Sequence, residues 1–153
     1  GTGSGAIAIT LSEKCPLWKI TATDKSNEAL KIAKLNTHNK INFYCGDWFD
    51  AVPDEKFDLI VSNPPYIDDH DPHLDSLKYE PLEALTSGSN GLDDIRIIIN
   101  ESPKYLKEGG YLLLEHGFNQ QKEIIELLKE SFFSINTYKD LNDIDRAVLA
   151  QYK

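Results

Sequence analysis

Short apolar runs alternate with helical patterns along the first part of the chain. The apolar spacing predicts helices over residues 5–14 and 26–36, and strands over 18–23, 41–45 and 57–62. Strands that alternate with helices in this way are typical of βαβ units, in which each helix connects two parallel strands.

The second predicted helix has a clear start and one apolar face. Ser26 is suited to be its N-cap, because a serine hydroxyl accepts a hydrogen bond from the free N–H groups of the first turn. We expect the core-facing side to consist of Ala29, Ile32, Ala33 and Leu35.

The last part of the chain continues the alternation and closes with two successive strands. The expected elements are a helix over 92–107 that stops at Gly109-Gly110, a buried strand over 111–115, a helix over 119–131, and strands over 132–138 and 146–152. A connection as short as Asp140–Asp145 joins antiparallel strands. We therefore expect a hairpin at one edge of the sheet, with 146–152 beside 111–115.

These elements predict one α/β domain over residues 1–153. Its sheet is expected to be mostly parallel and twisted, with one antiparallel strand and helices on both faces. An open sheet of this kind normally has a strand directly before its glycine loop, so the first strand is expected to precede Gly1, in a longer protein. The longest irregular stretch, 66–91, has the length of a functional or disordered loop.

Composition narrows the classes of function. The 153 residues are 41% hydrophobic and 27% charged, which is ordinary for a globular protein. A net charge of -9 argues against the basic surface that nucleic-acid binding requires. No apolar run reaches the roughly 18 residues of a membrane span. Cys15 and Cys45 have no metal-ligand spacing and are expected to be reduced thiols of a cytoplasmic protein.

A glycine loop opens the chain, and an acidic residue follows it at the sequence offset of a known type of ligand-binding residue. Gly1-Thr2-Gly3-Ser4-Gly5 precedes a helix, where backbone N–H groups can approach a ligand closely. Asp24 closes the next strand, at about the 20-residue offset of a ribose-binding acid. Asp24 could instead cap the helix that follows.

Asp47 and Trp48 follow the strand expected over 41–45, at the edge where ligands bind in open α/β sheets. Asp47 can accept a hydrogen bond from an exocyclic amine, and Trp48 can cover the face of a purine. Alternatively, Trp48 fills the core.

The segment SNPPYID, residues 62–68, ends a buried strand abruptly. Pro64 and Pro65 donate no backbone hydrogen bond, and Asn63 is kept extended by the proline after it. The result is a stiff turn that presents acceptors at the strand tip. An ordinary proline turn with a capping asparagine is the alternative.

Taken in order, GTGSG, Asp24, Asp47-Trp48 and Asn63-Pro64-Pro65-Tyr66 resemble a Rossmann-like class I S-adenosylmethionine-dependent methyltransferase. More narrowly, the chain is similar to the HemK/PrmC family of protein-glutamine N5-methyltransferases, which modify peptide chain release factors. The narrower resemblance rests on NPPYI, DPHL at 71–74, YEPLEAL at 79–85, and GGYLLLEHG at 109–117 followed by Gln120-Gln121.

This resemblance implies a cofactor, a substrate and a catalytic turn. Gly1, Thr2, Gly3, Ser4, Gly5, Asp24, Asp47, Trp48 and Asn63 would bind S-adenosyl-L-methionine and its product S-adenosyl-L-homocysteine. Asn63, Pro64, Pro65 and Tyr66 would hold the glutamine of a release factor, with Asn63, Pro64 and Tyr66 as the catalytic residues. The small helical domain at the N-terminus of that family, and its acid before the first glycine, have no counterpart in this sequence.

Two other functions stay open on the sequence. NPPY also occurs in adenine-N6 methyltransferases acting on DNA or RNA, although these need a flipped base and a basic groove. A non-catalytic cofactor-binding module is the third possibility. No metal is expected, because His70 and His73 lack a third ligand at suitable spacing, and His116 is expected to be structural.

Overall fold

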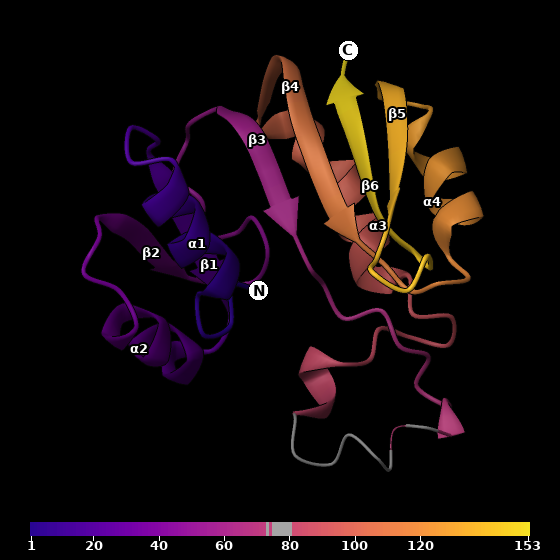
Figure 1. Cartoon of the computed structure of the whole chain (residues 1–153), viewed down its shortest axis with the longest axis horizontal. Helices are drawn as coiled ribbons and strands as arrows, with labels where there is room; N and C mark the ends of the chain where they lie inside the picture. The colour runs from indigo at the N-terminus through magenta and orange to yellow at the C-terminus, as the bar shows by residue number, and fades with distance from the viewer. Residues whose placement is uncertain (73, 75–80) are drawn as a thin grey trace. The chain divides into compact units, whose positions relative to one another are not determined.

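The computed structural model describes residues 1–72, 74 and 81–153, which form two compact units, Gly1–Glu55 and Lys56–Lys153 (Figure 1). The predicted loop 66–91 and the motifs DPHL (71–74) and YEPLEAL (79–85) therefore lie partly outside the described residues, and His73 lies wholly outside them. The prediction of a single catalytic domain over 1–153, with helices on both faces of one sheet, concerns both units together and stays a prediction.

The first unit is a βαβ unit that follows a helix. Its elements are α1 (Ala6–Lys14), β1 (Ile20–Asp24), α2 (Asn27–Leu35) and β2 (Ile41–Cys45). β1 and β2 pair in parallel from Ile20↔Ile41 to Asp24↔Cys45. Alternate residues of β1 are buried, and Ile20 and Ala22 form a small core with Ala8 of α1. Asp24 is the next residue on that buried face of β1.

The N-cap of α2 was predicted correctly, but its buried face only in part, because of the four predicted residues Ala33 alone is buried. The Ser26 hydroxyl accepts from the backbone N–H of Ala29 at 3.2 Å. The side chains that α2 buries are Leu30 and Ala33, whereas Ile32 is 50% exposed and Leu35 is 82% exposed. The helix carries two apolar stripes, and its rotation on the sheet, which no local pattern fixes, buries the one that contains Leu30.

The second unit contains a four-stranded sheet in the order β3-β4-β6-β5. Its strands are β3 (Phe57–Ser62), β4 (Leu106–Glu115), β5 (Phe132–Lys139) and β6 (Asp145–Tyr152). β3 and β4 are parallel, and β6 is antiparallel to both of its neighbours. The predicted insertion of 146–152 beside 111–115, and the hairpin with 132–138, are confirmed (Figure 1).

Two α-helices and the strands of the sheet together supply the core of the second unit. α3 (Asp93–Glu101) buries Ile95, Ile98 and Ile99, and α4 (Gln121–Leu128) buries Ile124 and Leu128. Both are shorter than the predicted helices over 92–107 and 119–131. The strand residues that complete this core are Leu106, Leu112, Leu114, Phe132, Val148 and Ala150.

The predicted end of α3 at Gly109-Gly110 was wrong. Pro103 has no N–H to continue the helix, and the Ser102 hydroxyl donates to the carbonyl of Ile99 instead. A short 3-10 turn, η3 (Ser102–Lys104), follows. Gly109 and Gly110 lie within β4, where the pairing with β3 shifts register and Gly109 adopts a φ of 75°.

In the connection from β3 to α3, residues near its start pair with residues near its end. Ile67 forms an isolated bridge with Thr86, and its N–H donates to the carbonyl of Leu85 at 2.9 Å. A second 3-10 turn, η2 (Leu82–Ala84), precedes this contact. The residues just after the Asn63 turn are thereby tied to residues that lead into α3.

Candidate active site

The glycine loop is shaped by two left-handed residues. Gly5 is the N-cap of α1 with a φ of 87°, and Gly3 has a φ of 57°. A Cβ added to Gly5 would lie 2.9 Å from Ile9 Cδ1 and 3.1 Å from Ala33 Cβ, so Gly5 is needed for packing. A Cβ on Gly3 would meet nothing within 4 Å. The loop is therefore open at Gly3, where a ligand can approach the backbone.

Asp24 holds this loop to the start of α2. Asp24 as a whole is only 7% exposed; its Oδ2 accepts from the Gly3 N–H and its Oδ1 from the Ser26 N–H, both at 2.8 Å. Each carboxylate oxygen has two lone-pair positions, so capacity to accept a ligand hydroxyl remains. The two interpretations of Asp24 are compatible, and ribose binding stays a prediction.

Trp48 lies beside the glycine loop and is not the buried aromatic residue of its segment. The core position is taken by Phe49, which is 8% exposed. Trp48 is half-buried, and a Cβ on Gly1 would lie 3.4 Å from its ring atom Cζ3. Its backbone has a φ of 40°, and its carbonyl accepts from the Thr23 hydroxyl at 3.0 Å. The first unit thus brings Gly1, Gly3, Asp24 and Trp48 together.

Asp47 differs from its neighbour. Its side chain is exposed, and its backbone carbonyl accepts from the N–H of Asp50 in a tight turn. No described contact joins it to the loop, so its role toward an exocyclic amine stays a prediction.

In the second unit, the Asn63 turn follows the last paired residue of β3. Ser62 pairs with Leu114, and the chain then leaves the sheet. Asn63 is exposed, whereas the ring of Pro64 is among the fully buried side chains. The buried proline anchors the turn, and the asparagine side chain is left accessible at the tip of the strand.

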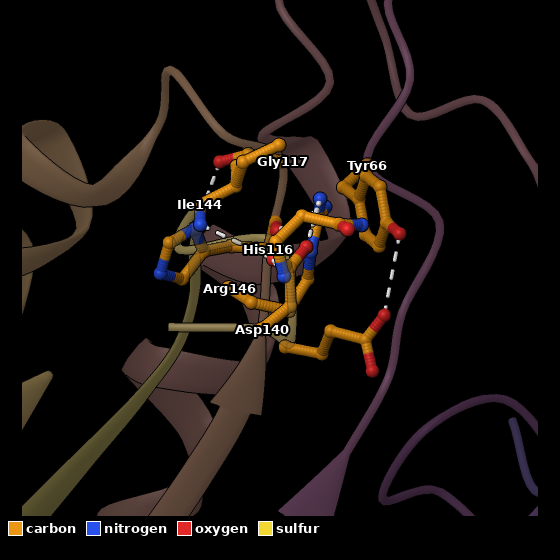
Figure 2. A network of polar contacts seen from close by, with 8 residues as sticks. Tyr66, His116, Gly117, Asp140, Ile144 and Arg146 are labelled. Atoms are coloured by element: carbon orange, nitrogen blue, oxygen red, sulfur yellow. Dashed lines mark hydrogen bonds and ion pairs between the residues drawn. The ribbon is translucent and has the colours of Figure 1, made fainter. Parts of the chain in front are cut away.

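Tyr66 is held at both its hydroxyl group and its carbonyl. The phenol donates to Oε1 of Glu115, the last residue of β4, at 3.3 Å (Figure 2). The carbonyl accepts from Nε2 of Gln120 at 2.9 Å. Burial, and then the negative charge of Glu115, raise the pKa of Tyr66, while Arg146 opposes the shift. The phenol is therefore neutral at ordinary pH and acts as a donor.

A polar network continues from β4 into the β5–β6 turn (Figure 2). Arg146 donates to the carbonyl of His116 at 3.3 Å and pairs with Asp140 at 3.1 Å. His116 is fully buried, and its Nδ1 lies 2.8 Å from the carbonyl of Gly117. Because a carbonyl only accepts, Nδ1 must carry the proton. The expected structural role of His116 agrees with this position.

The described residues contain no group of three or more metal-ligating side chains. Cys15 and Cys45 are both free thiols, and His70 is exposed. None of the helices in the described ranges has the length and hydropathy needed to cross a lipid bilayer.

Three polar residues near Tyr66 received no role in the sequence analysis: Glu115, Gln120 and Arg146. Glu115 and Gln120 stood in the motif used for the resemblance, GGYLLLEHG and the glutamines after it, but received no role. The available signal was positional. Glu115 ends a buried strand next to β3, so its side chain must lie near the turn that follows β3.

Residues 1–79 match the family model described as the methyltransferase small domain. The chain is 46% identical over 156 residues to "Release factor glutamine methyltransferase" from Coxiella burnetii, covering 99% of this chain. It spans only 56% of the length of that relative.

Solved structures share the fold at low identity. The ribosomal protein L11 methylase of Lactobacillus delbrueckii subsp. bulgaricus has a TM-score of 0.71 and 23% identity, over 100% of this chain and 67% of that one. The N-methyltransferase NodS of Bradyrhizobium japonicum, solved with S-adenosyl-l-homocysteine, has a TM-score of 0.62 and 19% identity, over 97% and 72%. The predicted α/β class I methyltransferase fold is confirmed, and the match over residues 1–79 shows that the chain belongs to the methyltransferase small domain family.

Proposed function

We propose that the protein transfers a methyl group from S-adenosylmethionine to the side-chain amide nitrogen of a glutamine in a peptide chain release factor. The name of the relative from Coxiella burnetii supports this choice, since the similarity extends over 99% of this chain. A relative from Escherichia coli with the same name is 38% identical over 99% of this chain.

The observation that carries the proposal is the accessibility of Asn63 in a turn that a buried proline anchors. Asn63 is exposed at the end of β3, next to the buried Pro64. An amide nitrogen is a poor nucleophile because its lone pair is delocalised into the carbonyl. Two fixed acceptors, the Asn63 side-chain oxygen and the Pro64 carbonyl, would engage both N–H groups of the substrate and direct its lone pair. This is catalysis by orientation and preorganised dipoles.

Tyr66 is proposed to position the substrate amide and not to act as a general base. Its raised pKa and its hydrogen bond to Glu115 keep the phenol protonated, so it does not accept the proton that the amide loses. Its ring, with Pro65 before it, would lie against the planar glutamine amide and exclude water. Asn63, Pro64 and Tyr66 are thus assigned as the catalytic residues, and all four residues of the turn as the substrate-binding residues.

The first unit fits the cofactor. The open backbone at Gly3, the buried carboxylate of Asp24 and the half-buried ring of Trp48 match a methionine moiety, a ribose and a purine, respectively. The proposed cofactor-binding set also contains Gly1, Thr2, Ser4, Gly5, Asp47 and Asn63. When bound, S-adenosylmethionine supplies an electrophilic methyl group on a sulfonium.

Release factor is the proposed partner, and the cytoplasm, where release factors act on ribosomes, is the proposed compartment. Direct nucleic-acid binding is not proposed, because a net charge of -9 opposes contact with phosphates.

The decisive experiment incubates the full-length protein with methyl-labelled S-adenosylmethionine in three separate reactions, which contain release factor, DNA or RNA as the substrate. Label on a glutamine of the release factor alone is the expected result. Label on adenine would establish the adenine-N6 alternative. Cofactor binding without transfer to any of the three would favour a non-catalytic module.

A further inference from the structure

A buried glutamine at the start of α4 contacts the catalytic turn. Gln120 is 6% exposed, and its Nε2 donates to the carbonyl oxygens of Tyr66 at 2.9 Å, Asn90 at 3.0 Å and Gly91 at 3.2 Å. Its Oε1 accepts from the N–H of Gly117 at 2.8 Å. One side chain therefore joins the turn after β3, the entry to α3 and the end of β4.

Two glycines make room for this amide. A Cβ on Gly91, which has a φ of 66°, would lie 2.1 Å from the Tyr66 oxygen and 2.8 Å from Gln120 Nε2. A Cβ on Gly117 would lie 3.0 Å from Gln120 Oε1 and 3.5 Å from Cδ2 of the Tyr66 ring. The backbone thus packs directly against both ends of the glutamine amide and against Tyr66.

The chemistry of the side chain matches this environment on both sides. An amide offers two N–H donors on one atom and an acceptor on the other, and here three carbonyls face its nitrogen and one N–H faces its oxygen. A carboxylate of the same size would place negative charge against three carbonyl oxygens. An apolar side chain would leave buried polar groups without partners.

Capping of α4 does not explain the residue. Gln120 occupies the N-cap position, but its side chain makes no capping hydrogen bond to the helix. The four partners of its side-chain hydrogen bonds precede α4 in the chain, and three of them are Tyr66 itself and the Asn90-Gly91 pair that packs against it.

We propose that Gln120 is a positioning residue that fixes the main chain at Tyr66 and thereby the geometry of the Asn63–Tyr66 turn. The proposal rests on the function proposed above and deepens it. Gln120 acts through the Tyr66 carbonyl and does not touch the reacting atoms. Its loss should let the turn move relative to the amide that it orients.

The test compares Gln120→Met with Gln121→Met in the full-length protein. Both changes remove one glutamine amide at the start of α4, but Gln121 donates to Asp145 and not to the turn. Gln120→Asn, which keeps the amide on a shorter side chain, is a milder second variant if Gln120→Met does not fold. We measure kcat with release factor, affinity for S-adenosylhomocysteine by calorimetry, and hydrogen exchange of the amides of Ile67 and Asp69.

For Gln120→Met we expect kcat to fall by about 10-fold to 100-fold, because a small misplacement of orienting groups has effects of that order. Cofactor affinity should stay within about threefold, and exchange at Ile67 and Asp69, whose N–H groups donate to Leu85 and Gly88, should quicken by about tenfold or more. Gln120→Asn should show intermediate values, and Gln121→Met should leave all three measurements near wild type.

Unchanged exchange at Ile67 and Asp69 in Gln120→Met, or equal losses in the two methionine variants, would overturn the proposal. If wild-type protein does not methylate release factor, the proposed function fails by itself. The exchange measurement needs no substrate and then still decides whether Gln120 fixes Tyr66.

Discussion

Asn63 and Tyr66 lie in one turn but meet opposite environments. The Asn63 side chain is exposed at the strand tip, while Tyr66 is fixed through its hydroxyl by Glu115 and through its carbonyl by Gln120. A site of this kind combines one accessible hydrogen-bonding group with a rigid support, and the two residues should respond differently to substitution.

Asn63→Ala keeps the turn, since Pro64 and Pro65 remain, but removes one of the two acceptors proposed for the substrate amide. Loss of a single preorganised dipole should appear mainly in kcat, as a fall of roughly 10²–10³-fold. Asn63→Asp retains an acceptor and should be more active than Ala. Steady-state kinetics with release factor tests this, and near wild-type kcat for the Ala variant would contradict the assignment of Asn63.

Asp24→Ala removes the acceptor of the Gly3 and Ser26 N–H groups as well as the proposed ribose ligand. Hydrogen bonds to charged groups contribute roughly 1.5–3 kcal/mol each, so cofactor affinity should fall about tenfold or more. Ser26→Ala is the matched control. It removes the N-cap of α2, at a cost of about 1 kcal/mol of stability, and should leave calorimetric cofactor affinity almost unchanged. Equal affinities in both variants would show Asp24 to be a cap.

At the scale of elements, the β5–β6 hairpin is stabilised by one carboxylate in its turn. Asp140 Oδ1 accepts from the N–H groups of Asn142 and Ile144, and Oδ2 pairs with Arg146, whose guanidinium also reaches the carbonyl of His116. The turn is thereby tied to the end of β4, next to Glu115 and Tyr66.

This arrangement predicts an acid-dependent stability. The backbone N–H of Ile144, together with the backbone N–H of Asn142 and the guanidinium of Arg146, lowers the pKa of Asp140 from 3.8, against a smaller opposing effect of desolvation. A lowered folded-state pKa means that the stabilisation is present above pH 3.8 and is lost as the pH falls through the folded-state value. Urea denaturation should show Asp140→Asn less stable than wild type near pH 6, with the difference shrinking below pH 3.8. A difference that grows toward acid would contradict this account.

At the scale of the whole molecule, charge is the dominant global property. The chain has 25 acidic and 16 basic residues, and its ion pairs are largely at the surface, where each contributes little. With a net charge of -9, repulsion between the excess negative charges lowers the stability of the folded state.

Screening of this repulsion should stabilise the protein. Between about 10 mM and about 150 mM salt the Debye length shrinks from about 30 Å to about 8 Å. We expect the midpoint of urea denaturation at pH 7 to rise over this interval of sodium chloride. A falling midpoint would mean that local ion pairs, such as Lys107–Asp58, outweigh the net repulsion.

The sequence by itself determined the order of helices and strands, the glycine loop and the Asn63 turn. These features depend on local chemistry. Gly3 and Gly5 permit a positive φ, and Pro64 and Pro65 end the strand because they have no backbone N–H to donate to a neighbouring strand. The hairpin and its place beside β4 also followed, because short connections restrict topology.

Tertiary structure alone decided which stripe of α2 is buried, that Gly109 lies in a bulge of β4, and how Tyr66 is supported. Gln120 lies 54 residues from Tyr66 and 29 from Gly91 in the chain, and Glu115 lies 49 residues from Tyr66. Such contacts depend on strand register and helix rotation, which are set when distant segments pack together. No periodicity within one segment records them, so the support of the turn became visible only in the fold.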